Sequence, residues 1–98
     1  MEVKDNVIIY EYMISNGKFV KYIHEAKRNG GAFEFKKNGN RRAVYKYEFD
    51  LVKNNRVLLF EDDEEKARKM LIDYYKNQVE KLKKNLDVVE KNINTLVE

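Results

Sequence analysis

The side chains that could carry out catalysis are few and scattered. Nucleophilic catalysis needs a Ser, Thr or Cys beside a base, but the chain has no Cys, and its single Ser and single Thr are Ser15 and Thr95. Ser15 precedes Asn16-Gly17, where Ser is a common turn residue. His24 is the only His, the residue type that most often serves as a general base. We expect no catalytic residue.

The sequence also offers few side chains that could bind a metal ion or a cofactor. Acidic residues gather only at Glu61–Glu65, without the spacing of a calcium-binding loop. A single His without Cys cannot build a zinc site. The glycines follow Asn in turn patterns and do not form a phosphate-binding loop. The sequence therefore predicts no metal, no cofactor and a protein that is not an enzyme.

The strongest polar cluster is a set of four cations around one turn. Lys36, Lys37, Arg41 and Arg42 flank Asn38-Gly39-Asn40. A hairpin tip with this charge could contact phosphate groups or an acidic protein surface. Charges on a hairpin also discourage edge-to-edge pairing of sheets. We interpret these four cations as a partner-binding site and leave open whether the partner is a protein or a nucleic acid.

Composition and charge indicate the cellular compartment in which we expect the protein. The net charge is +3, and residues 1–60 carry 12 Lys or Arg against 7 Asp or Glu, whereas residues 61–98 carry 8 against 10. The absence of Cys fits a reducing compartment, and no apolar stretch is long enough for a membrane span. The N-terminus lacks the features of a signal peptide. We expect a soluble cytoplasmic protein without membrane contact.

The elements that must position these residues fall into two halves of a single domain, residues 1–98. Residues 1–61 are rich in Val, Ile, Phe and Tyr between Asn/Gly pairs, which predicts strands, and residues 62–98 are rich in Lys, Glu and Leu, which predicts a helix. The fold class is therefore α+β: an antiparallel β-meander of four to five strands, followed by one long C-terminal amphipathic helix.

Turn signals set the expected strand pairing. Asn16-Gly17 favours a two-residue hairpin loop that pairs Ile14 with Phe19 and Tyr10 with Ile23. Residues 18–29 also fit a helix that ends at Gly30, so strand and helix both remain open for this segment, with strand favoured.

The later hairpins are placed by keeping aromatic residues together. A three-residue loop at residues 38–40 pairs Phe35 with Ala43 and Phe33 with Tyr45. That register keeps five aromatic residues on one face, which a one-residue slip would divide: Phe33, Phe35, Tyr45, Tyr47 and Phe49. A turn at Asn54-Asn55 then pairs Leu51 with Leu58 and Phe49 with Phe60.

The helix carries two apolar stripes. Asp62 is the expected N-cap, with Glu65 completing a capping box. The first stripe, Ala67, Met70, Leu71 and Tyr74, occurs only in the first half of the helix. We expect this half to cover the aromatic face of the meander.

The second stripe has the strict 3-4 spacing of the a and d positions of a coiled coil. We call its eight residues the seam, and expect them to form a dimer interface: Ile72, Tyr75, Val79, Leu82, Leu86, Val89, Ile93 and Leu96. The chain has no second helix of matching length, so a second copy is the simplest partner. The flanking positions Lys76, Lys83, Gln78 and Asn85 give no clear charge code for helix orientation.

The stretch LLFEDDEEKARKMLIDYYKNQVEKLKKNL resembles a style of small protein encoded by phages and mobile elements of low-GC bacteria, among them anti-CRISPR and other host-takeover proteins. The resemblance covers residues 57–86 and transfers no functional residue. It implies a protein that binds and blocks a host protein in the host cytoplasm, and the seam and the absence of catalytic groups make this protein a non-enzymatic homodimer in our interpretation. Many anti-CRISPR proteins mimic DNA through negative charge, which this basic chain does not. The alternative is a nucleic-acid-binding regulator that uses the basic hairpin.

Overall fold

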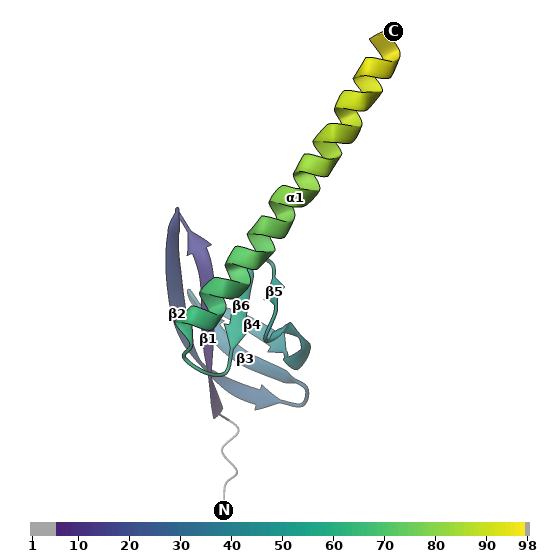
Figure 1. Cartoon of the computed structure of the whole chain (residues 1–98). Coiled ribbons are helices and arrows are strands. Elements are labelled where there is room, and N and C mark those ends of the chain that lie inside the picture. The colour runs from purple at the N-terminus through teal and green to yellow at the C-terminus, as the bar shows by residue number, and fades with distance from the viewer. Residues whose placement is uncertain (1–5, 98) are drawn as a thin grey trace, which may run out of the picture.

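The computed structural model describes residues 6–97, which form a β-sheet head and one helix that projects far beyond it (Figure 1). The strands are β1 (Asn6–Ser15), β2 (Lys18–Asn29), β3 (Ala32–Lys37), β4 (Asn40–Tyr45), β5 (Val52–Lys53) and β6 (Arg56–Leu59). A short 3₁₀ helix, η1 (Lys46–Glu48), follows β4, and the helix α1 spans Glu64–Val97. The described residues measure 77 × 26 × 23 Å.

The first four strands form consecutive antiparallel hairpins. Asn16 and Gly17 both have positive φ, as a two-residue type I′ turn requires. This turn pairs Ile14 with Phe19 and Tyr10 with Ile23, so the predicted first hairpin is confirmed. Residues 18–29 form strand β2 and not a helix, because the turns at both of its ends return the chain into the sheet.

The sheet is antiparallel but has six strands, so the expected count of four to five was too low. The strand order is β4-β3-β2-β1-β6-β5. After β4 the chain crosses through η1 to the opposite edge, and β6 pairs with β1. The four hairpin-linked strands are the predicted meander; the β5–β6 hairpin is added beside its first strand.

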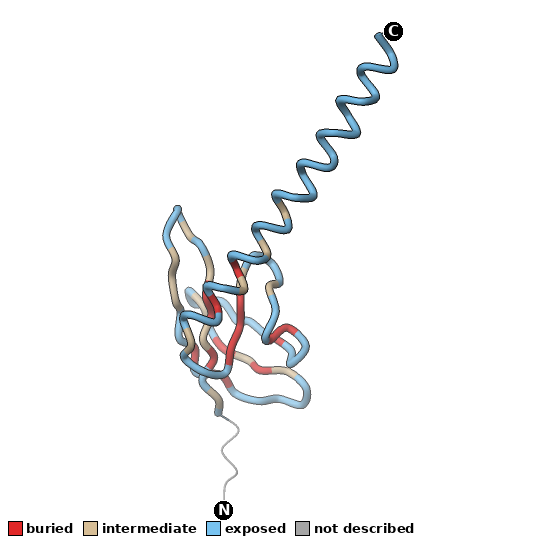
Figure 2. The backbone as a smooth tube through the Cα atoms, in the orientation of Figure 1, coloured by how far each residue is buried: buried red, intermediate tan, exposed pale blue. Residues whose placement is uncertain are grey.

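Two apolar clusters lie on opposite faces of β1 and β6. One contains Ile9, Ala26, Phe33, Phe35, Val44, Phe49 and Leu58, so β3 and β4 cover that face. The other contains Tyr12, Val57, Leu59, Ala67 and Leu71, and lies under α1. The central strands are therefore covered on both sides, and the buried residues, red in Figure 2, lie in the head and at the start of α1.

The first half of α1 packs on the sheet, as predicted, but on a different face. Ala67 and Leu71 are buried against Tyr12, Val57 and Leu59, not against the Phe33–Phe35 cluster. The predicted all-aromatic face was wrong because Tyr45 and Tyr47 point to solvent and stack on each other. The strand β3 brings its phenylalanines to the face away from the helix.

One predicted register was wrong, and a second is confirmed over a shorter ladder than expected. The β3–β4 loop has two residues, Asn38 and Gly39, both with positive φ, so Phe35 pairs with Arg42 and Phe33 with Val44. The turn at Asn54-Asn55 forms in the predicted register, but its ladder ends at the pair Val52–Val57, so the expected pairs of Leu51 with Leu58 and Phe49 with Phe60 do not form. Leu58 forms its isolated β-bridge with Phe49 and not with Leu51. The rings of Phe49 and Phe60 nevertheless stack, with their centres 3.9 Å apart.

The helix begins at Glu64, and its N-cap lies one residue later than predicted. Asp63 is the cap, because its Oδ1 accepts a hydrogen bond of 3.0 Å from the backbone N–H of Lys66. Asp62, the expected cap, instead accepts hydrogen bonds from the Tyr12 hydroxyl at 2.9 Å and from Lys21 Nζ at 3.0 Å. This ties the start of α1 to β1 and β2.

Candidate functional site

The seam lies on α1 and is exposed to solvent along its whole length. Ile72 is 46% exposed, Leu82 65% and Leu96 85%, and no residue in the described stretch 72–97 is buried. At 1.5 Å per residue the 34 residues of α1 span about 51 Å, and Figure 2 shows the distal part exposed throughout. The eight seam residues therefore share one helix face, and within the described residues none of the distal ones packs on the head.

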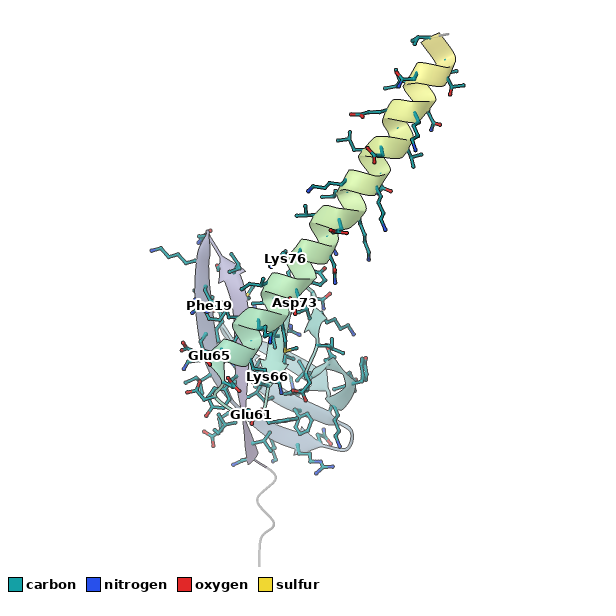
Figure 3. The ribbon with its side chains drawn as sticks, viewed as in Figure 1. Phe19, Glu61, Glu65, Lys66, Asp73 and Lys76 are labelled. Atoms are coloured by element: carbon teal, nitrogen blue, oxygen red, sulfur yellow. The ribbon has the colours of Figure 1, made fainter. Side chains whose placement is uncertain are left out.

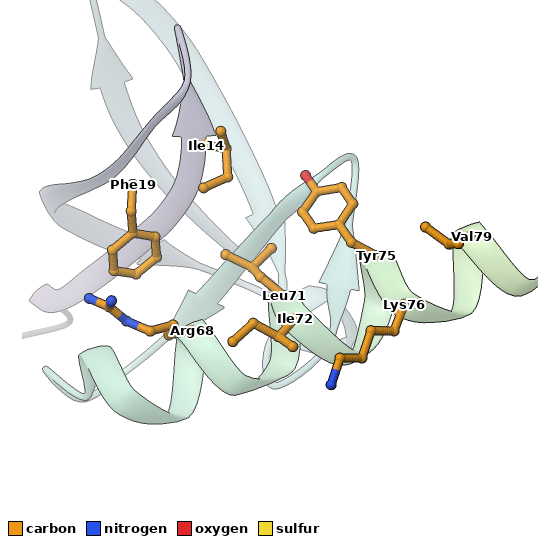
Figure 4. Close-up of a pocket in the computed structure, with 8 residues that line it drawn as sticks. All are labelled: Ile14, Phe19, Arg68, Leu71, Ile72, Tyr75, Lys76 and Val79. Atoms are coloured by element: carbon orange, nitrogen blue, oxygen red, sulfur yellow. The ribbon is translucent and has the colours of Figure 1, made fainter.

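An apolar groove of about 500 Å³ lies where the seam meets the head (Figure 4). One wall is the tip of the β1–β2 hairpin, which presents the cross-strand pair Ile14 and Phe19. The other wall is α1, with Leu71 at the bottom and three seam residues on it: Ile72, Tyr75 and Val79. The seam therefore does not stop at the head but runs into this groove, which the sequence did not predict.

Ion pairs and one cation–π contact fix the helix against the head. Lys21 Nζ on β2 lies 3.0 Å from Asp62 and 3.4 Å from Glu64. Lys66 Nζ lies 2.9 Å from Asp50, and the Arg68 guanidinium lies 4.8 Å from the Phe19 ring centre. Phe19 and Lys66 are labelled in Figure 3. These contacts are partly exposed and individually weak, but together they set the direction in which α1 leaves the head.

The basic hairpin does not present its four cations as one patch. Lys36 and Arg41 are cross-strand partners on one face of the sheet, and Arg41 Nη2 lies 2.7 Å from Glu34. Lys37 and Arg42 belong to the opposite face, where Lys37 Nζ lies 2.8 Å from Glu11. The alternation of side chains along a strand divides the cluster, and two of its four cations already hold a carboxylate.

Glu11 is the center of a buried charge cluster that the sequence gave no reason to expect. The residue is fully buried, and its carboxylate accepts hydrogen bonds from Lys37 Nζ and Arg56 Nη1, both at 2.8 Å. His24 Nε2 lies 3.0 Å from the same carboxylate, and its ring stacks on Phe35. Within residues 6–97, every buried side-chain polar atom has a partner.

Burial would raise the pKa of Glu11, but the hydrogen bonds from Lys37, Arg56 and His24 outweigh it and lower the pKa to about 2. Glu11 therefore stays ionised at neutral pH and cannot serve as a proton donor there. It borders a polar cavity of about 430 Å³ that Arg42, Glu48 and Arg56 also line. Burial, and the bond to Asp62, raise the pKa of Tyr12 to about 12.

Two tyrosines form an exposed aromatic surface on the head. The rings of Tyr45 and Tyr47 stack with their centres 5.7 Å apart, and the residues are 45% and 65% exposed. Lys53 Nζ lies over the Tyr47 ring at 4.7 Å. Tyrosine is enriched at the energetic centres of protein interfaces because it buries a large rigid area and keeps a polar end. This pair is a better partner-binding candidate than the divided hairpin.

Comparisons with known protein families, with curated proteins and with solved structures find no match to this chain. In the described part of the chain, no helix is long and apolar enough to cross a membrane. Residues 6–97 also contain no group of three or more His, Cys, Asp or Glu side chains placed to hold a metal ion.

Proposed function

We propose that the protein is a non-enzymatic homodimer that binds another protein, with α1 as the dimerisation element and the head as the binding element. The observation that carries the proposal is the exposed seam. Eight apolar side chains at 3-4 spacing face water along a projecting helix. Burying a half-exposed Leu or Ile contributes about 1 kcal/mol, so a second seam lying on the first is a strong source of association energy.

The polar interior of the head supports a binding role over a catalytic one. Catalytic acids and bases need a pKa near the working pH, whereas the Glu11 cluster is neutralised internally and lowers the Glu11 pKa to about 2. Such a cluster fixes the relative positions of β1, β3 and β6. We assign it a structural role.

The head binds its partner, in this proposal, through the surface around Tyr45 and Tyr47. Blocking of a host protein, which the resemblance implied, is the form of binding that we propose for it. The nucleic-acid alternative draws less support, because Lys37 and Arg41 are paired within the head.

Light scattering tests the dimer. The wild-type protein at micromolar concentration should give twice the 11.8 kDa chain mass. Leu82→Asp with Leu86→Asp should give monomers, because each change places a charge in a dry interface. Lys81→Asp with Lys84→Asp, on neighbouring positions outside the seam, is the matched control and should remain dimeric. A wild-type monomer at both micromolar and ten-fold higher concentration would contradict the proposal.

Affinity capture from nuclease-treated host lysate tests the head. The wild type should retain one protein that Tyr45→Ala with Tyr47→Ala loses, while both remain dimers. Binding that disappears on nuclease treatment, or falls steeply with salt, would favour the nucleic-acid alternative.

A further inference from the structure

The groove and the seam share three residues, so whatever covers the start of the seam also fills the groove. Ile72, Tyr75 and Val79 belong to both, and Ile14 and Phe19 form the facing wall (Figure 4). A helix lying on these seam residues lies against the β1–β2 hairpin as well. The occupant of the groove therefore depends on the direction of the partner helix.

We infer that the groove is filled by the distal turns of α1 from a second copy, so that the two helices of the dimer are antiparallel. This inference rests on the proposed dimer and assigns its orientation. It makes the groove a composite site, in which one protomer supplies the hairpin wall and its partner supplies the apolar side chains that fill it.

The spacing of the seam fits antiparallel pairing without a leftover residue. If Leu82 lies against the partner's Leu86, the remaining layers follow in register. Val79 then lies against the partner's Val89, Tyr75 against the partner's Ile93, and Ile72 against the partner's Leu96. Each of the eight seam residues of one protomer therefore lies opposite a seam residue of the other protomer. The partner's Ile93 and Leu96, 53% and 85% exposed in the single chain, enter the groove.

The four flanking positions considered from the sequence give no charge code by themselves, but adding the next e position, Glu90, favours this direction. Positions e and g flank a coiled-coil seam and set orientation through their charges. Here Lys76, Lys83 and Glu90 occupy e, and g holds Gln78, Asn85 and Asn92. In an antiparallel pair, e positions lie beside e positions. Lys76 then lies beside the partner's Glu90, which gives two attractive contacts per dimer. Lys83 lies beside the partner's Lys83, which gives one repulsive contact. Parallel helices bring e beside g, where those amides offer no ion pair.

The shape of the protein points the same way. A parallel partner would enter the groove at the level where it carries its own head, so two hairpins would compete for the space along the same helix turns. An antiparallel partner enters with residues 89–97, which are exposed on every side of the helix. This part of the partner's α1 is remote from the partner's own head, so no second hairpin competes for the space.

Engineered cysteines test the orientation, and the chain has no Cys of its own to interfere. Under mild oxidation, Ile72→Cys with Leu96→Cys in one chain should give a covalent dimer on a non-reducing gel, with a disulfide between residues 72 and 96. Each single variant should stay unlinked, because its partner at that layer is not a cysteine. Lys84→Cys, on the outer side of the helix, controls for random collision.

A charge exchange provides a second readout that does not depend on disulfide geometry. Lys76→Glu alone, and Glu90→Lys alone, should each weaken the dimer about ten-fold, because two attractive contacts become repulsive. The double variant should return to within about two-fold of the wild type. Lys84→Glu, with the same change of charge on the outer side, should change little.

The outcomes separate the two proposals. Disulfides in the single-cysteine variants, or single charge variants that dimerise as tightly as the wild type, would show a parallel dimer and overturn the inference while leaving the homodimer intact. A wild-type monomer by light scattering would overturn both. Linking of residues 72 and 96 with recovery in the double charge variant would establish the antiparallel arrangement.

Discussion

Replacing Glu11 by Gln should destabilise the head although it hardly changes the shape of the side chain. The carboxylate is fully buried and holds Lys37, Arg56 and His24. The amide of Gln keeps one acceptor oxygen but directs an NH₂ group at donors. It therefore leaves at least one cation without a negative partner, which is the costly way to break a buried pair.

The pKa of Glu11 gives the size of the effect. A fall from 4.5 to about 2 corresponds to about 3 kcal/mol of extra stabilisation of the charged form. Lys37 and Arg56 remain 21% and 20% exposed, so water screens part of this, and we expect a loss of about 2 kcal/mol at pH 7. Because the folded pKa is depressed, this stabilisation is complete above pH 4.5 and is lost as the pH falls through about 2.

Urea unfolding followed by circular dichroism, at pH 7, 5 and 3 and at one chain concentration, measures the effect. The difference between wild type and Glu11→Gln should be about 2 kcal/mol at pH 7 and 5 and about half of that at pH 3. Glu25→Gln, at an exposed position on the neighbouring strand, is the control and should cost less than about 0.5 kcal/mol. Equal costs for the two variants, or a Glu11 difference that does not shrink at pH 3, would refute the reasoning.

Two further outcomes are expected. Lys37→Glu should lower the melting temperature by roughly 10 °C or more, since it places a second carboxylate beside Glu11. Arg41→Glu, on the exposed face, should lower it by less than about 3 °C. Equal shifts of the two variants in a thermal melt would contradict the division of the basic hairpin between two faces. Truncation after Tyr75 should leave a folded, monomeric head, because the last buried residue of α1 is Leu71; loss of the strand signal in circular dichroism would show that the distal helix also supports the sheet.

Short-range sequence signals predicted the strand pairing correctly where they agreed with one another. Asn16-Gly17 fixed the first hairpin register, because its backbone conformation and the alternation of its strands agree. At the second hairpin the two signals conflicted. The aromatic pattern favoured a three-residue loop, but Asn38 and Gly39 both adopt positive φ and form a two-residue turn. A turn is decided locally, whereas Tyr45 and Tyr47 were assigned to the core only by their residue type.

Long-range features could not be predicted. Nothing near Arg56 in the sequence indicates that β6 joins β1, and the partners of Glu11 lie 13, 26 and 45 residues away. The seam was predictable, since its spacing lies within one continuous helix. Its continuation into a groove depends on where the β1–β2 hairpin lies, and that position is set by tertiary ion pairs such as Lys21 with Asp62.

The position of β6 beside β1 has a consequence for the order of folding. Strands β1 to β4 close through two-residue turns, which need little loop-closure entropy and form rapidly. Docking of β6 must close a chain of more than 40 residues, because Glu11 pairs with Leu58. Until that step, β1 is an open edge strand with Glu11 short of one of its cations, and open edges are sites of intermolecular pairing. During folding, the protein is therefore most prone to intermolecular strand pairing after the first hairpins have formed and before β6 docks on β1.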